Sequence, residues 1–211
     1  MVIEIFNGEI GVPAKCGTRF FSKTQKNPDR MEGYWSREVT SLVTSLPTNI
    51  INTEFQTAEK LNWEVWRCLK YFVIRNPMEH LMSALHTDMV TCLWDISEIK
   101  IVLDKYLSEY GDTLYHPNLY CLLYILFKEL KINPKCMDIS EVSLFISNSG
   151  FDIQYDKDEY SFKDTINWKS KEEGIELVKT NFPIEWDKLV KHTIKDTEYY
   201  NYLLSNTRKI L

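Results

Sequence analysis

The stretch GVPAKCGTRFF (residues 11–21) combines residue types that bind anions at a turn. A short apolar run leads through a proline into this turn, and a helix is expected to begin just after it. Such a helix N-terminus presents unpaired backbone N–H groups and the positive end of the helix dipole. Gly17 lets the backbone approach an anion closely, while Lys15 adds a mobile positive charge. Thr18 and Arg19 add a hydroxyl and a planar cation, so the turn is a candidate phosphate-binding loop.

Two other interpretations of this turn stay open. It could be an ordinary connection between a strand and a helix that carries a surface lysine. Cys16 could also be a catalytic thiol, although the sequence shows no partner histidine near it. The loop of the nucleotide triphosphatases, Gly-x-x-x-x-Gly-Lys-Ser/Thr, does not fit, because Lys15 precedes Gly17 instead of following it.

A second stretch, YFVIRNPMEHLMSAL (residues 71–85), places Arg75 at the end of an apolar run and Ser83 eight residues later. The apolar run predicts a buried central strand, and Pro77 with Asn76 as its cap predicts the start of a helix. Arg75 and Ser83 can therefore converge on one anion near the carboxyl ends of the strands, where open α/β sheets bind ligands. The alternative is an arginine paired with a nearby carboxylate and a serine bonded within its own helix.

Together the two stretches resemble one family, the sulfotransferases. PAKCGTR resembles their 5′-phosphosulfate loop, and RNPMEHLMSAL resembles their 3′-phosphate motif, in which a serine follows an arginine by eight residues. Lys-x-Gly-Thr-Arg resembles the heparan sulfate branch in particular, and IKDTEYYNY near the C-terminus resembles the carbohydrate sulfotransferases. The resemblance leaves the middle of the chain poorly covered. It also has two departures, because Ala14 separates Pro13 from Lys15 and His80 stands where an arginine is common.

The resemblance implies an enzyme whose sulfuryl donor is 3′-phosphoadenosine 5′-phosphosulfate (PAPS) and whose product is 3′-phosphoadenosine 5′-phosphate (PAP), with no metal required. Lys15 would stabilise the charge that develops on the bridging oxygen during in-line transfer. Arg75 and Ser83 would bind the 3′-phosphate. Further donor contacts would come from five loop residues: Cys16, Gly17, Thr18, Arg19 and Phe20. The acceptor would be a hydroxyl or an amine of a carbohydrate or another small molecule.

The resemblance also implies a general base between the two motifs, which is a glutamate or a histidine in family members. This part of the sequence contains no histidine, so a glutamate is implied. Glu38 in WSREVTSLV is the first choice, and Glu32 and Glu54 are the alternatives. Each of the three could instead be a solvated surface carboxylate.

Six further residues could contribute to the acceptor site or steer anionic ligands, and each has a simpler interpretation as well. Tyr34 and Trp35 lie near Glu38 and could stack on a sugar or aryl ring, or they could belong to the core. His116 in LYHPNLY could lie near the acceptor, but a structural role is the simpler interpretation. Three lysines could steer anionic ligands or form a solvated helix face: Lys169, Lys171 and Lys179.

Strands and helices alternate along the chain, which predicts an α/β fold. We expect a single domain over residues 1–211, with a mostly parallel central sheet flanked by helices on both faces, the P-loop-like sulfotransferase fold. Asn7-Gly8 favours a hairpin, and one interrupted strand is the alternative. Strands are expected at residues 2–6, 10–12, 49–52, 69–74 and 136–139. Helices are expected at residues 18–26, 36–46, 57–69, from 77, 96–110, 119–130, 140–146, and from 171 with a break at 183.

Composition limits the other function classes. The net charge of −5 over 211 residues argues against a general nucleic-acid binder. No apolar run approaches the roughly 20 residues of a membrane span, and the N-terminus shows no signal peptide. Five scattered cysteines indicate free thiols in a reducing compartment. We therefore expect a cytoplasmic protein with no nucleic-acid or membrane partner. Compared with the Golgi sulfotransferases that it resembles, the sequence shows no amino-terminal membrane anchor and is rich in Lys, Asn and Ile, so the resemblance implies a short member of bacterial or bacterial-virus type, in the host cytoplasm if viral.

Two rival functions remain at this level. A catalytically silent domain that binds PAP, as a sensor or interaction module, would carry the same two motifs. A phosphate-loop kinase is disfavoured, because the sequence has neither the Gly-Lys-Ser/Thr loop nor a convincing magnesium-binding aspartate after an apolar strand.

Overall fold

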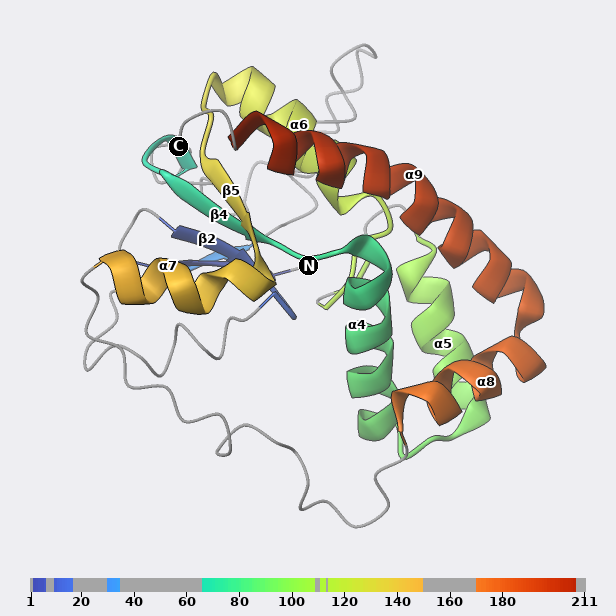
Figure 1. The fold of residues 1–211 in the computed structure, drawn as a ribbon. Coiled ribbons are helices and arrows are strands. Elements are labelled where there is room, and N and C mark those ends of the chain that lie inside the picture. Colours follow the sequence, from blue (N-terminus) through green and yellow to red (C-terminus); the bar gives the residue numbers. More distant parts are fainter. Residues whose placement is uncertain are drawn as a thin grey trace, which may run out of the picture.

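The structure is a computed structural model, and it describes residues 2–6, 10–16, 30–34, 66–108, 111–112, 114–149 and 170–207. Within these residues a five-stranded sheet is combined with helices that pack against both of its faces (Figure 1). The α/β class expected from the sequence is therefore confirmed.

The strands of the sheet follow the order β3-β1-β2-β4-β5. They are β1 (Val2–Phe6), β2 (Ile10–Pro13), β3 (Arg30–Tyr34), β4 (Tyr71–Ile74) and β5 (Lys135–Asp138). β2, β4 and β5 run parallel, whereas β1 is antiparallel to both β2 and β3. The prediction of a mostly parallel sheet is thus wrong for the half that contains β1 and β3. β1 and β2 pair in the register Phe6↔Ile10, as a hairpin, because so short a connection returns the chain antiparallel.

β4 lies between β2 and β5, and its last three residues, Phe72, Val73 and Ile74, are completely buried. This confirms the central strand that the apolar run predicted. The register between β2 and β4 places Gly11 opposite Phe72. A Cβ atom on Gly11 would lie 2.5 Å from the Phe72 ring, so this close approach requires a glycine.

The helices are α4 (Pro77–Thr91), α5 (Ile96–Tyr106), α6 (Leu119–Leu130), α7 (Val142–Ser149), α8 (Lys171–Asn181) and α9 (Pro183–Thr207), with a 3-10 turn η2 (Ile139–Glu141) before α7. α6 has the predicted bounds, and the break before Pro183 is confirmed. Asn76 caps α4 as predicted, accepting the N–H of Met78 at 3.0 Å. At the start of η2, the Asp138 carboxylate is the cap and accepts the N–H of Ser140 at 2.9 Å. None of the helices in the described ranges is long and apolar enough to cross a membrane.

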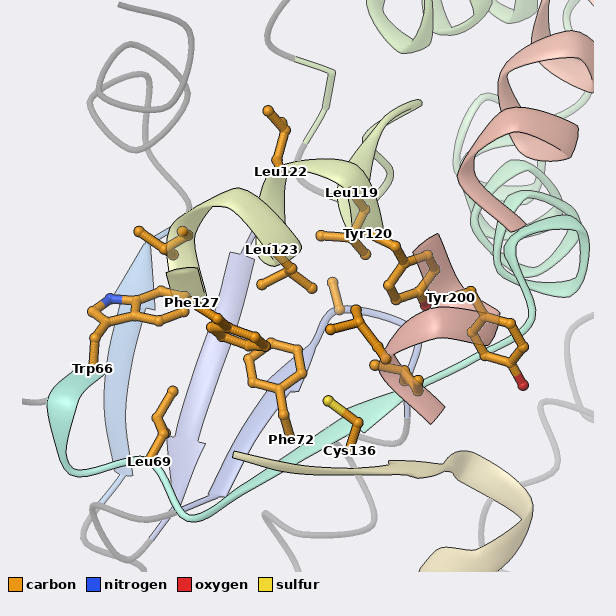
Figure 2. Close-up of a cluster of buried hydrophobic side chains, with 14 residues drawn as sticks. Trp66, Leu69, Phe72, Leu119, Tyr120, Leu122, Leu123, Phe127, Cys136 and Tyr200 are labelled. Atoms are coloured by element: carbon orange, nitrogen blue, oxygen red, sulfur yellow. The ribbon is translucent and has the colours of Figure 1, made fainter. Parts of the chain in front are cut away.

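Alternate side chains of β4 point to the two faces of the sheet. Phe72 and Ile74 pack with α6 and with the end of α9, in the cluster that Figure 2 shows around Phe72 and Phe127. Val73 packs on the opposite face with Val142 of α7. A third cluster joins α4, α5, α8 and the first part of α9, to one side of the sheet (Figure 1). The ends of β2 and β4 therefore lie where the sheet meets this group of helices.

Candidate functional site

The turn after β2 holds Lys15 in a left-handed backbone conformation, with a φ of 64°. The N–H of Cys16 donates to the carbonyl oxygen of Pro13 at 3.0 Å and closes the turn. A positive φ at the third position of such a turn favours glycine or asparagine, so a lysine there carries about 1–2 kcal/mol of backbone strain. Strain of this kind persists only where surrounding contacts hold the residue in place.

Arg75 makes one of these contacts. It is the first residue after β4, and its Nη1 donates to the carbonyl oxygen of Lys15 at 2.9 Å. Because β2 and β4 are parallel neighbours, the two residues leave the sheet at the same edge. The two motifs identified in the sequence therefore meet in the structure.

The side chain of Lys15 makes a second contact, with α4. Its Nζ donates to Oγ1 of Thr87 at 2.7 Å, and the Thr87 hydroxyl donates to the carbonyl oxygen of Ser83 at 3.0 Å. Thr87 follows Ser83 by one helical turn, so the Lys15 ammonium lies against the helix face that carries Ser83. The ends of β2 and β4 and the first three turns of α4 together form one local site.

The Arg75 guanidinium is mostly buried, yet its charge is only weakly paired within the described residues. Its Nε lies 3.6 Å from a carboxylate oxygen of Glu79, whose side chain is 63% exposed. That distance is too long for a hydrogen bond, and an exposed pair of this kind contributes little. The Nε atom is itself buried without a hydrogen-bond partner in this part of the chain. Arg75 therefore retains the capacity to bind an anion.

His80, the second departure from the family pattern noted in the sequence, is buried. Its Nε2 lies 3.1 Å from the carbonyl oxygen of Leu114. Burial and the nearby charge of Arg75 lower the pKa of His80 to about 4, so the ring is neutral at physiological pH. His80 thus connects α4 to the segment before α6 and adds no positive charge to the site.

Cys16 is completely buried, and burial raises the pKa of its thiol to about 12. A thiol with this pKa stays protonated at neutral pH, which argues against the nucleophilic cysteine left open above. The N–H of Cys16 is engaged with Pro13 within the turn. The remaining loop residues expected to bind the donor, Gly17–Phe20, lie outside the described residues.

The predicted base Glu38 and its alternative Glu54 also lie outside the described residues. The same holds for Trp35 of the predicted acceptor site and for Lys169. The alternative base, Glu32, belongs to β3, which is separated from β2 by β1. Tyr34 is the last residue of the same strand. The register places Glu32 opposite Glu4 of β1, and Glu4 opposite Val12, so Glu32 is level with the end of β2 but two strands away from it.

Three further candidates lie where the simpler interpretation of each predicted, as a structural histidine or as lysines on a solvated helix face. His116 is buried, and its Nδ1 accepts the backbone N–H of Asn118 at 3.2 Å. Lys171 is an exposed residue at the start of α8. Lys179 pairs with Glu176 at 3.0 Å on the exposed face of the same helix.

Three polar residues near the site were not identified from the sequence: Thr87, Tyr120 and Asp196. Thr87 could have been found from its four-residue spacing after Ser83. Tyr120 and Asp196 belong to the stretches LYHPNLY and IKDTEYYNY, but neither stretch indicates which partner its polar groups contact. Tyr120 contacts the backbone of Arg75, and Asp196 contacts the start of α6.

A separate hollow of about 400 Å³ lies near the amino end of β5. Tyr124, Lys128, Asn133 and Tyr202 are among its lining residues, and none of the site residues described above lines it. Within the part of the chain that is described, no cluster of histidine, cysteine, aspartate or glutamate side chains could hold a metal ion.

Comparison of the chain with protein-family models, with curated proteins and with solved structures found no match. The function assigned to the chain therefore depends on its own residues and their geometry.

Proposed function

We propose that the protein is a sulfotransferase that moves a sulfuryl group from PAPS to a hydroxyl or an amine of a carbohydrate or another small acceptor. The observation that supports this most is the contact between the Arg75 guanidinium and the Lys15 carbonyl oxygen. It brings the expected 3′-phosphate motif and the expected 5′-phosphosulfate motif into one site. In this proposal the parallel half of the sheet and its flanking helices form a sulfotransferase fold.

Lys15 acts on the leaving nucleotide. Its Nζ is bonded to the neutral hydroxyl of Thr87, a contact that it can exchange for an oxygen of the donor. As the sulfur–oxygen bond of PAPS breaks, negative charge develops on the bridging oxygen. An ammonium group already placed beside that oxygen lowers the barrier without reorganisation.

Arg75 and Ser83 bind the 3′-phosphate. The planar guanidinium suits two parallel hydrogen bonds to a phosphate, and Arg75 has a buried Nε without a hydrogen-bond partner among the described residues. Ser83 lies two turns into α4 and is only half-buried, so its hydroxyl is within reach of the same ligand. The 3′-phosphate is what distinguishes PAPS from simple adenylates.

Glu38 takes the proton from the acceptor as the acceptor oxygen or nitrogen bonds to sulfur. The sulfuryl group then carries its new bond to the acceptor, the electron pair of the broken bond stays on PAP, and the proton stays on the base.

Nucleotide binding tests the assignment of the donor. PAP should raise the midpoint temperature of thermal unfolding, because a ligand that binds only the folded state stabilises that state. At a PAP concentration about 100 times the Kd, the free energy of unfolding should rise by about 2.7 kcal/mol. ATP and 5′-AMP lack the 3′-phosphate and should raise the midpoint much less. Arg75→Ala should remove most of the difference between PAP and 5′-AMP. Equal responses to PAP and ATP would contradict the proposal.

Transfer of labelled sulfate from PAPS onto extracts rich in carbohydrate tests the catalytic part. Glu38→Gln should lower transfer by about 10²–10⁴-fold and leave PAP binding intact, since it removes a base and not a donor contact. Glu32→Gln and Glu54→Gln are the matched variants, and the base is reassigned if one of them loses transfer while Glu38→Gln retains it. A wild-type protein that binds PAP and transfers nothing would be the silent PAP-binding domain instead.

A further inference from the structure

The hydroxyl of Tyr120 forms hydrogen bonds with both backbone groups of Arg75. It accepts the N–H of Arg75 at 2.9 Å and donates to the carbonyl oxygen of Arg75 at 2.6 Å. Arg75 is the first residue after β4, which ends at Ile74. A single side chain therefore satisfies both backbone groups of the residue whose guanidinium reaches Lys15.

Tyr120 is itself held in place by α9. Its ring is completely buried and meets the ring of Tyr200 edge-on, with the centroids 5.6 Å apart. Figure 2 shows the two side chains next to each other. Its backbone N–H donates to Oδ2 of Asp196 at 3.0 Å, and the N–H of Cys121 donates to Oδ1 at 2.8 Å. Asn118, at the N-cap position of α6, makes no capping bond through its side chain. A carboxylate from α9 thus caps α6 and fixes the first turn that carries Tyr120.

We propose that Tyr120 is a positioning residue for recognition of the 3′-phosphate, and that Asp196 of α9 holds it in that position. The inference rests on the proposed function of Arg75. The direction of a side chain at the end of a strand follows its backbone, so a backbone fixed by Tyr120 fixes where the Arg75 guanidinium lies. A guanidinium displaced from its ligand loses charge-assisted hydrogen bonds, each of which contributes about 10- to 100-fold to affinity. α9, which starts more than 100 residues after Arg75, is therefore part of the donor site.

The test uses Tyr120→Phe, which keeps the buried ring and its contact with Tyr200 and removes only the hydroxyl. Calorimetry would measure the Kd of PAP and of 5′-AMP, two ligands that differ only in the 3′-phosphate. The hydroxyl of Tyr120 also interacts with the Cys16 thiol in the turn after β2. We expect the affinity for PAP to fall by about 10- to 100-fold and that for 5′-AMP to fall several times less, so that the preference for PAP decreases. The matched control is Tyr124→Phe, one turn further along α6, which should change neither value.

The ratio of the two affinities separates positioning from general loosening of the fold. A Tyr120→Phe protein that loses PAP and 5′-AMP binding equally, or keeps the wild-type ratio, would overturn the inference. A wild-type protein that shows no preference for PAP would instead overturn the proposed function. If Tyr120→Phe does not fold, Asp196→Asn takes its place, because it keeps the size of the side chain and weakens the cap. It should lower the preference for PAP severalfold, and an unchanged preference would again overturn the inference.

Discussion

Lys15 joins a strained backbone to a side chain that reaches another element. Its φ of 64° is held by the Arg75 contact at its carbonyl oxygen, and its Nζ is bonded to Thr87. A glycine would adopt this backbone conformation without strain, but it would have no ammonium group. The residue type is therefore better explained by chemistry at Nζ than by the needs of the turn.

Substitution of Lys15 separates these two roles. In the proposed function, Lys15→Ala and Lys15→Gly should both lower sulfuryl transfer by about 10²–10³-fold, because both remove the ammonium group proposed to stabilise the leaving oxygen. Lys15→Gly should be more stable than Lys15→Ala by about 1–2 kcal/mol, since only glycine accepts the positive φ freely. The measurements are kcat with PAPS and urea-induced unfolding. Equal stability of the two variants would show that the turn is not strained, and retained transfer would remove Lys15 from the mechanism.

α9 is tied to the rest of the molecule by polar contacts as well as by apolar packing. Asp196 caps α6, and the hydroxyl of Tyr200 donates to Oδ2 of Asp138 at 2.6 Å, at the end of β5. Burial raises the pKa of Asp196 from its ordinary value of 3.8 to about 7, although the N–H groups of Tyr120 and Cys121 favour the charged form. The cap of α6 is therefore a carboxylate that titrates near neutral pH.

The stability of the protein should depend on pH through Asp196. Between its unfolded pKa near 3.8 and its folded pKa of about 7, the folded state binds the proton and the unfolded state does not. The stabilisation that protonated Asp196 gives to the folded state is thus present at low pH, and it is lost as the pH rises through about 7. Asp196→Asn cannot titrate, so the unfolding free energy of the wild type should fall relative to this variant between about pH 4 and pH 8. We expect a change of a few kcal/mol, at about 1.4 kcal/mol per pKa unit. Urea unfolding of both proteins across this pH range measures the change. A difference in unfolding free energy between the wild type and Asp196→Asn that stays constant with pH would contradict the raised pKa of Asp196.

At the scale of the whole molecule, the described core consists of two clusters on the faces of the sheet and one among the helices. Cys16 belongs to the cluster on one face of the sheet, and Cys136 belongs to the cluster on the other face. The reactivity of these two thiols therefore measures how well both faces are packed. Burial raises the pKa of each of them to about 12. Cys68, by contrast, is exposed.

Alkylation of the native protein at neutral pH should therefore modify Cys68 rapidly and leave Cys16 and Cys136 protected. Only the thiolate reacts, and burial suppresses both its formation and the access of the reagent. Mass spectrometry of iodoacetamide-treated protein, before and after addition of urea, measures the difference. Modification of Cys16 as fast as Cys68 in the folded protein would show that the turn after β2 does not pack as described.

Features that depend on neighbouring residues were predicted well from the sequence. The start of α4 follows from Asn76 and Pro77, and the burial of β4 follows from its apolar run. For β1 and β2 the sequence favoured a hairpin but left one interrupted strand open, and the antiparallel pairing decides for the hairpin. The pairing of β3 with β1 was not predicted, because strand pairing depends on where the chain returns and not on the local pattern.

The sequence alone determined which residue types stand at the two candidate anion-binding motifs and how far apart they lie, and the resemblance to the sulfotransferases predicted their ligand. Only the tertiary structure decided which of them meet. Arg75 reaches the carbonyl oxygen of Lys15, Tyr120 holds the backbone of Arg75, and Asp196 caps α6 across 76 positions. Such contacts join residues that no periodicity connects. They form because burial in one core leaves each polar group only the partners that the fold brings within hydrogen-bonding distance.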